Sequence, residues 1–139
     1  VDQCDEFIIA IAANLNKRNG FIPIEDRIKM IQEIYKDKPQ VKVIDITSTI
    51  ITEYCKANNI KYIVRGIRNS SDFEYEKGLA EMNFYLGGIQ TMLVFGFCEP
   101  HGINISSTFV RERIHYGLSI KEFVPEPVAQ YIIKNKLTY

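Results

Sequence analysis

Two arginines three positions apart, Arg65 and Arg68, stand at the end of an apolar run in the segment VRGIRNSSDFEYE, residues 64–76. Arginine binds phosphate through two parallel hydrogen bonds, so such a pair at a strand end suits a phosphorylated substrate. Gly66 lies between them, and its lack of a side chain lets the backbone come close to a ligand. Acidic residues follow directly. An ion pair between these arginines and the acids of DFEYE therefore explains the pattern equally well.

Three hydroxyl residues, Ser106, Ser107 and Thr108, open a predicted helix in the segment ISSTFVRER, residues 105–113. A helix start carries about four unpaired N–H groups and the positive end of the helix dipole. With hydroxyl donors added, it is suited to binding phosphate. The simpler interpretation is that Ser106 or Ser107 only caps the helix, which is common.

A further positive position is Lys17, in the loop sequence ANLNKRNGF, residues 13–21. Taken alone, an exposed loop lysine is usually only solvated. His101 and His115 have no metal-ligand spacing, and no cysteine stands near enough in sequence to complete a zinc motif. We therefore predict no metal ligand from the protein. The sequence also has no Walker A, GxGxxG or GxSxG motif.

The elements that must position these residues alternate along the chain. Apolar runs predict strands at residues 6–12, 41–46, 61–66 and 91–97. Helical patterns occupy residues 23–37, 48–59, 72–86, 106–117 and 125–137, and the third carries Phe73, Leu79, Met82 and Leu86 at helical spacing. This alternation predicts an α/β fold with a doubly wound parallel sheet. Ligands of such sheets bind beyond the carboxyl ends of the strands, where Lys17, the arginines and the Ser106 turn are placed.

Length and composition agree with one domain, residues 1–139. The formal net charge of +0 gives no global field that would draw the protein to nucleic acid or to a membrane. The three cysteines are few and widely spaced, which is typical of a reducing cytoplasm rather than of a disulfide framework. No apolar run is long enough to span a bilayer.

The segment VRGIRNSSDFEYE, followed by LAEMN, resembles the phosphopantetheine adenylyltransferase family. The stretches AIAANLNKR, ISSTFVRE and EFVPEPVAQYI are similar to the same family in the same order, so the similarity covers essentially the whole chain. ISSTxxR alone would indicate only the wider nucleotidyltransferase superfamily. The resemblance implies a Rossmann-like fold and a Mg²⁺-assisted reaction, in which ATP and 4′-phosphopantetheine give dephospho-CoA and pyrophosphate in coenzyme A biosynthesis.

The resemblance also implies roles for residues at matched positions. Lys17 would hold the phosphopantetheine phosphate near the α-phosphate of ATP, and Lys17 and Arg68 would be the catalytic residues. Arg65 and Ile51 would contact phosphopantetheine. The implied ATP-binding residues are Gly66, Ile67, Arg68, Glu76, Gly102, Ile103, Asn104, Ile105, Ser106, Ser107 and Thr108. Asp72 and Glu74 would orient the arginines. The family also implies a homo-hexamer, with dephospho-CoA and CoA as product or feedback ligands.

Two features depart from the family pattern. The family begins with a strand and a GTFDPxxxGH-type turn that supplies a Thr and a His for the ATP phosphates, and the resemblance here starts only after that segment. We expect the natural protein to contain it, and a protein that truly started at Val1 to be inactive. Gly102 stands where the family commonly has an aromatic residue. Packing of that side chain on the nucleotide is thereby lost, although backbone amides can still bind phosphate.

Two alternatives remain open from the residues. One is a related nucleotidyltransferase with another phosphorylated acceptor, such as nicotinamide mononucleotide or glycerol phosphate. DFEYE together with an apolar helix at Ile51 favours phosphopantetheine over these. The other is a non-catalytic nucleotide-binding paralogue, which the absent histidine segment favours.

Overall fold

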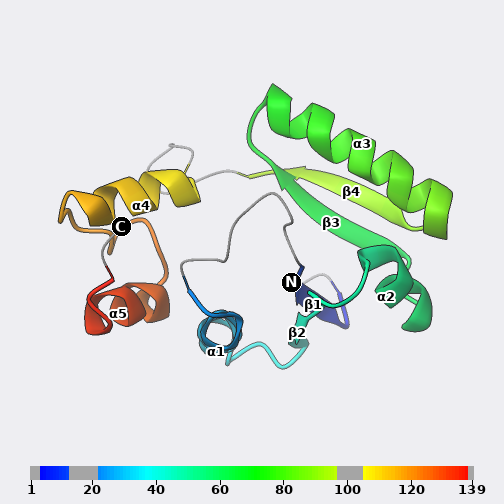
Figure 1. Ribbon diagram of the computed structural model, residues 1–139. Coiled ribbons are helices and arrows are strands. Elements are labelled where there is room, and N and C mark those ends of the chain that lie inside the picture. The colour runs from blue at the N-terminus through cyan, green and yellow to red at the C-terminus, as the bar shows by residue number, and fades with distance from the viewer. Residues whose placement is uncertain (1–3, 13–21, 97–104, 138–139) are drawn as a thin grey trace. The chain divides into compact units, whose positions relative to one another are not determined.

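Strands and helices alternate along the chain in the computed structural model, which describes residues 4–12, 22–96 and 105–137 (Figure 1). The elements are β1 (Phe7–Ile11), α1 (Ile24–Ile34), β2 (Val41–Asp45), α2 (Ile51–Ala57), β3 (Tyr62–Ile67), α3 (Ser70–Gly87), β4 (Gln90–Phe95), α4 (Ser107–His115) and α5 (Glu126–Lys134). Every strand and helix that the sequence predicts is present, with ends that shift by a few residues. The α/β class is confirmed.

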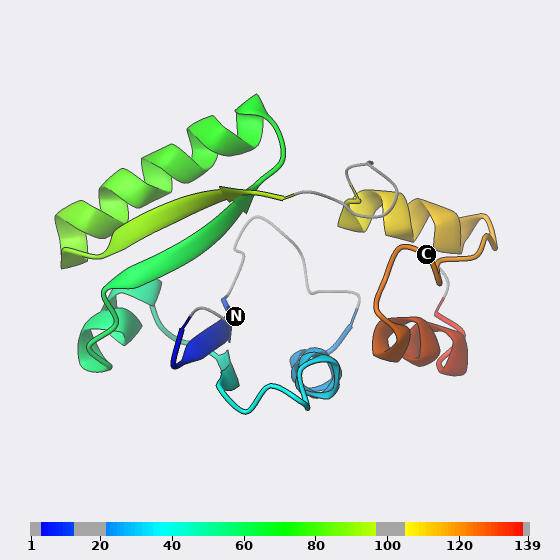
Figure 2. The same cartoon turned by 180° about the vertical axis from the view of Figure 1, so that it is seen from behind.

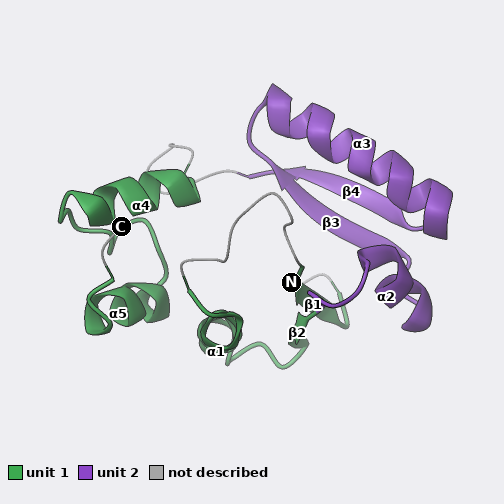
Figure 3. Ribbon diagram, in the orientation of Figure 1, with its two compact units in different colours: residues 1–45, 105–139 green, residues 46–104 purple. Residues whose placement is uncertain are grey.

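The chain folds as two compact units (Figure 3). Unit 1 comprises residues 1–45 and 105–139, and unit 2 comprises residues 46–104. In unit 1, β1 pairs in parallel with β2, from Phe7 opposite Val41 onward. In unit 2, β3 pairs in parallel with β4, from Tyr62 opposite Gln90 to Ile67 opposite Phe95. Within the described ranges, the strands of the expected sheet are thus hydrogen-bonded as two parallel pairs.

Unit 1 is held together by the pairing of β1 with β2, by helix packing and by side-chain hydrogen bonds between residues distant in sequence. Helix α1 packs on β2 and on α5. Pro23 precedes α1, where a proline is tolerated because the missing N–H would be unpaired in any case. The Tyr131 hydroxyl on α5 donates to Oδ2 of Asp26 on α1 at 2.7 Å, and this bond raises the pKa of Tyr131. The contact ties the last helix to the first.

Helix α3 of unit 2 lies along β3 and β4, as Figures 1 and 2 both show. Its least exposed positions recur every three or four residues and are polar or small: Asp72, Glu76, Ala80, Asn83 and Gly87. Asn83 Nδ2 donates to Thr91 Oγ1 of β4 at 3.4 Å. The large apolar residues that predicted this helix lie on its other sides, and Tyr85 is 86% exposed. Polar contacts therefore orient α3 on its strands.

No helix in the described ranges has both the length and the apolar character needed to cross a membrane.

Gly88 ends α3 in the left-handed conformation, with a φ of 66°, and its N–H donates to the Phe84 carbonyl at 2.7 Å. Because a side chain is strained there, Gly88→Ala is expected to lower the free energy of unfolding by about 1 kcal/mol. Gly78→Ala is the matched control, since a Cβ at Gly78 in the helix interior would meet no atom within 4 Å. It should raise the free energy of unfolding, by up to ~1 kcal/mol. Urea denaturation measures the free energy of unfolding of both variants. If it changes in the same direction in both, the left-handed conformation at Gly88 does not account for the effect.

Candidate functional site

The described site residues that the sequence predicts fall into one group in each unit. Unit 2 holds Ile51, Arg65, Gly66, Ile67, Arg68 and Glu76, and unit 1 holds Ile105, Ser106, Ser107 and Thr108. The predicted site residues Lys17, Gly102, Ile103 and Asn104 lie outside the described residues. The unit 2 residues lie on α2, on β3 and directly after it, and on α3, and the unit 1 residues lie at the start of α4.

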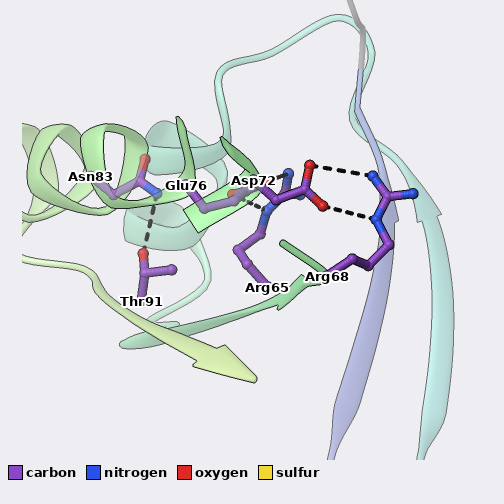
Figure 4. A network of polar contacts seen from close by, with 6 residues as sticks. All are labelled: Arg65, Arg68, Asp72, Glu76, Asn83 and Thr91. Carbon is purple, nitrogen blue, oxygen red and sulfur yellow. Dashed lines mark hydrogen bonds and ion pairs between the residues drawn. The ribbon is translucent and has the colours of Figure 1, made fainter. Parts of the chain in front are cut away.

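Arg65 and Glu76 form a two-bond ion pair between β3 and α3 (Figure 4). Arg65 Nε donates to Glu76 Oε2 at 2.7 Å, and Nη2 donates to Oε1 at 2.7 Å. The Glu76 side chain is 10% exposed and that of Arg65 is 48% exposed. The hydrogen bonds that Arg65 donates to Glu76 raise the pKa of Arg65. This carboxylate therefore fixes the direction of the guanidinium while about half of the arginine remains in contact with solvent.

Arg68 forms the second pair, with Asp72 in the first turn of α3 (Figure 4). Its Nε donates to Asp72 Oδ2 at 2.8 Å, and Nη2 donates to Oδ1 at 3.4 Å. Asn69 caps the helix, and its Oδ1 accepts the Asp72 N–H at 2.8 Å. Sequence reasoning missed this cap, although an Asn three residues before an Asp is a recognisable helix-start signal.

Glu76, rather than Glu74, is the acid that holds the Arg65 guanidinium. Residues four apart lie on the same face of a helix, so Asp72 and Glu76 both turn toward the arginines, whereas a residue two positions on points elsewhere. The expectation that Glu74 orients an arginine was therefore wrong, and the expectation for Asp72 is confirmed.

Both arginines thus form ion pairs with the acids that follow them, which is one of the two explanations that the sequence left open. A guanidinium has five N–H donors and stays charged when paired, so two hydrogen bonds to a carboxylate do not exhaust it. The Arg68 side chain is 44% exposed, similar to Arg65. The pairs thus fix the directions of two guanidinium groups whose side chains are each about half exposed.

A pocket of about 320 Å³ opens at the carboxyl ends of β3 and β4. It is lined by Ile67, Asn69, Ser70, Phe73 and Phe95. Parallel α/β folds bind ligands beyond this end of their strands. A Cβ added to the neighbouring Gly66 would meet no atom within 4 Å, so the backbone is also approachable there.

The start of α4 forms the second group. Ser106 caps the helix, because its Oγ accepts the Phe109 N–H at 3.1 Å. Ser107 and Thr108 follow as the first helical residues and are exposed. Arg111 Nη2 donates to Thr108 Oγ1 at 3.1 Å, which brings a positive charge to the first turn. The capping role is thus confirmed for Ser106, and the exposed first turn keeps the features suited to an anion.

The described residues do not form a protein site for Mg²⁺. Among them, no group of three or more His, Cys, Asp or Glu side chains could hold a metal ion. The carboxylates nearest the arginines, those of Asp72 and Glu76, are occupied by guanidinium hydrogen bonds.

The hydrogen bond from Arg68 lowers the pKa of Asp72, and this is measurable. In an NMR titration, Asp72 should titrate below the 3.8 of an unperturbed aspartate. The pKa of Asp72 is lower in the folded than in the unfolded protein. The pair therefore stabilises the fold fully at pH values above the unfolded pKa, and this stabilisation is lost as the pH falls through the folded pKa. Arg68→Gln should return the pKa toward its ordinary value, whereas Lys77→Gln, on the same helix, should leave it in place. Equal shifts in both variants would show that general charge, not this pair, sets the titration.

Comparison with protein families matches residues 1–113 to the family described as cytidylyltransferase-like. A phosphopantetheine adenylyltransferase of Bacteroides thetaiotaomicron is 44% identical over 122 residues, which is 88% of this chain and 78% of that protein. One of Phocaeicola vulgatus is 43% identical over 122 residues, with the same shares of 88% and 78%. One of an Arthrobacter species is 35% identical over 129 residues, 93% of this chain and 79% of that protein. These similarities extend over both groups of site residues.

Proposed function

The chain belongs to the phosphopantetheine adenylyltransferase family within the cytidylyltransferase-like proteins, and from this premise we propose that it transfers the adenylyl group of ATP to 4′-phosphopantetheine. The products are dephospho-CoA and pyrophosphate, in coenzyme A biosynthesis. The observation that carries this proposal is the similarity to adenylyltransferases along most of the chain. The arginine pairs and the α4 start support it, because both suit phosphorylated substrates.

The reaction needs no nucleophile from the protein. An oxygen of the phosphopantetheine phosphate attacks the α-phosphorus of ATP, the bond from that phosphorus to the bridging oxygen breaks, and pyrophosphate leaves with the electron pair. What the protein supplies is alignment of the two substrates and stabilisation of negative charge in the transition state.

We assign the site residues to the two substrates as follows. Lys17, Arg65 and Ile51 contact phosphopantetheine, and Lys17 also faces the reacting α-phosphate of ATP. Arg68 and the neighbouring Gly66 and Ile67 contact ATP, with Glu76. The remaining ATP contacts are Gly102, Ile103, Asn104, Ile105, Ser106, Ser107 and Thr108. The ion pairs Arg65–Glu76 and Arg68–Asp72 fix the directions of the two guanidinium groups. The division of residues between the two substrates rests on the resemblance to the family.

The cofactor, assembly and location follow the family in this proposal. Mg²⁺ would be held by phosphate oxygens of ATP and by water, as hard cations in phosphate sites commonly are. When bound, it neutralises phosphate charge. The protein is cytoplasmic and assembles as a homo-hexamer, with CoA as a further ligand of the phosphopantetheine side.

Pyrophosphate release tests the proposed function in the protein as its gene encodes it. ATP with 4′-phosphopantetheine should support turnover, and nicotinamide mononucleotide or glycerol phosphate should not replace the acceptor. Turnover with one of those acceptors would make the protein a different nucleotidyltransferase. Calorimetric binding of ATP without pyrophosphate release would identify a non-catalytic nucleotide-binding protein.

A further inference from the structure

Helix α4 needs specific contacts to hold its position. It has nine residues, Ser107–His115, and none of them is buried. A helix of that length is marginal in water on its own, because few hydrogen bonds repay the cost of its first turn. The contacts that fix α4 therefore decide where its first turn points.

The Arg113 side chain makes the contacts that join α4 to the segment after it. Its Cζ lies 4.8 Å from the ring centroid of Phe123 and 5.7 Å from that of Phe109. The two rings meet edge to face, with centroids 5.1 Å apart. Arg113 Nε also donates to the Ser119 carbonyl at 2.7 Å. One guanidinium thus contacts the helix and the following segment together.

The backbone at the end of α4 turns the chain back toward this cluster. The Leu118 N–H donates to the Arg113 carbonyl at 2.8 Å, and the Gly117 N–H donates to the Ile114 carbonyl at 3.0 Å. Gly117 has a φ of 66°. This is the glycine-ended turn that often closes helices. It brings residues 119–123 alongside the helix, where the Arg113 side chain secures them.

Phe109 connects the cluster to the start of the helix. Its ring belongs to the cluster, while its backbone N–H donates to the capping oxygen of Ser106 at 3.1 Å. Thr108 is the preceding residue. A shift of the Phe109 ring would therefore move the first turn and its cap.

We infer that Arg113 is a positioning residue, which holds the first turn of α4 in place for the phosphates of ATP without touching them. The inference rests on the proposed function, since it takes this turn to be a phosphate site. It assigns to Arg113 and Phe123 an effect on ATP binding that is transmitted through Phe109. A merely structural role would instead affect stability and the fraction of active protein.

The test compares Arg113→Met with Lys121→Met, which removes an exposed positive charge from the adjoining segment. Arg113→Met should raise the KM and the calorimetric Kd for ATP about 10-fold, because it removes the contacts of the guanidinium with two aromatic rings and one charged hydrogen bond. The KM for 4′-phosphopantetheine should change by less than about twofold, because its ligands lie elsewhere. Arg113→Lys keeps a positive charge over the rings, so its KM and Kd for ATP should rise by an intermediate factor, roughly threefold. Lys121→Met should match the unsubstituted protein.

An unchanged Kd for ATP in Arg113→Met overturns the inference. The inference is also overturned if the fraction of active protein falls while the KM and Kd for ATP of the folded fraction stay unchanged, because a purely structural role gives this result. If Arg113→Met does not fold, the Kd for ATP is measured in Phe123→Leu instead, because this substitution removes the ring and keeps an apolar contact. A higher Kd supports the inference, and an unchanged Kd overturns it. If the unsubstituted protein binds ATP without turnover and Arg113→Met binds it more weakly, the inference holds and the proposed function fails.

Discussion

Replacing Arg68 by alanine is expected to lower kcat/KM for ATP by about 30-fold, which corresponds to ~2 kcal/mol. The reason is that a guanidinium at the end of β3 forms charge-assisted hydrogen bonds with phosphate that alanine cannot replace. Steady-state pyrophosphate release at saturating 4′-phosphopantetheine measures the effect. The unfolding midpoint of the variant should move little, because the Arg68–Asp72 pair is close to solvent and such pairs contribute little to stability.

Asp72→Asn separates the two explanations of this arginine. It removes the carboxylate of the pair and keeps the guanidinium, so most of the activity should remain if Arg68 binds ATP. If Arg68 serves only the ion pair, both substitutions should leave kcat/KM unchanged and should alter stability to the same small extent. An unchanged rate in Arg68→Ala would remove this residue from the proposed site.

Lys17→Ala is expected to lower kcat by about 100-fold, the magnitude found when one group that stabilises transition-state charge is removed. The KM for ATP should change much less, because the proposed role of the ammonium group is to bring the attacking phosphate to the α-phosphorus. Single-turnover kinetics measure the chemical step directly. This expectation depends on the sequence resemblance, since Lys17 lies outside the described residues.

Arg18→Ala is the matched control, because it removes the positive charge next to Lys17 in the sequence. It should retain most of kcat if the effect is specific to Lys17. A higher KM for ATP at unchanged kcat in Lys17→Ala would mean that the lysine binds the ground state of the nucleotide only. Equal losses in both variants would indicate a general field of the loop.

The predicted elements were accurate because they depend on short-range patterns. The run around Ile63 and Val64 predicts β3, and the periodic apolar residues of 72–86 predict α3, whatever surrounds them. The same patterns could not say which side of α3 packs. Leu79 and Met82, whose spacing predicted the helix, are exposed, whereas Glu76 is buried. The bidentate pair with Arg65 makes that burial acceptable for a carboxylate.

The sequence by itself determined the residue types at the site, their order, and the class of element that carries each one. The tertiary structure decided that Glu76, rather than Glu74, meets Arg65, and which strands are neighbours. It also decided that Arg113 would close on Phe109 and Phe123. The physical reason is range. Periodicity, capping and turn chemistry act over a few residues, whereas a salt bridge or a ring contact is set by the packing of segments that are distant in sequence or reversed by a turn.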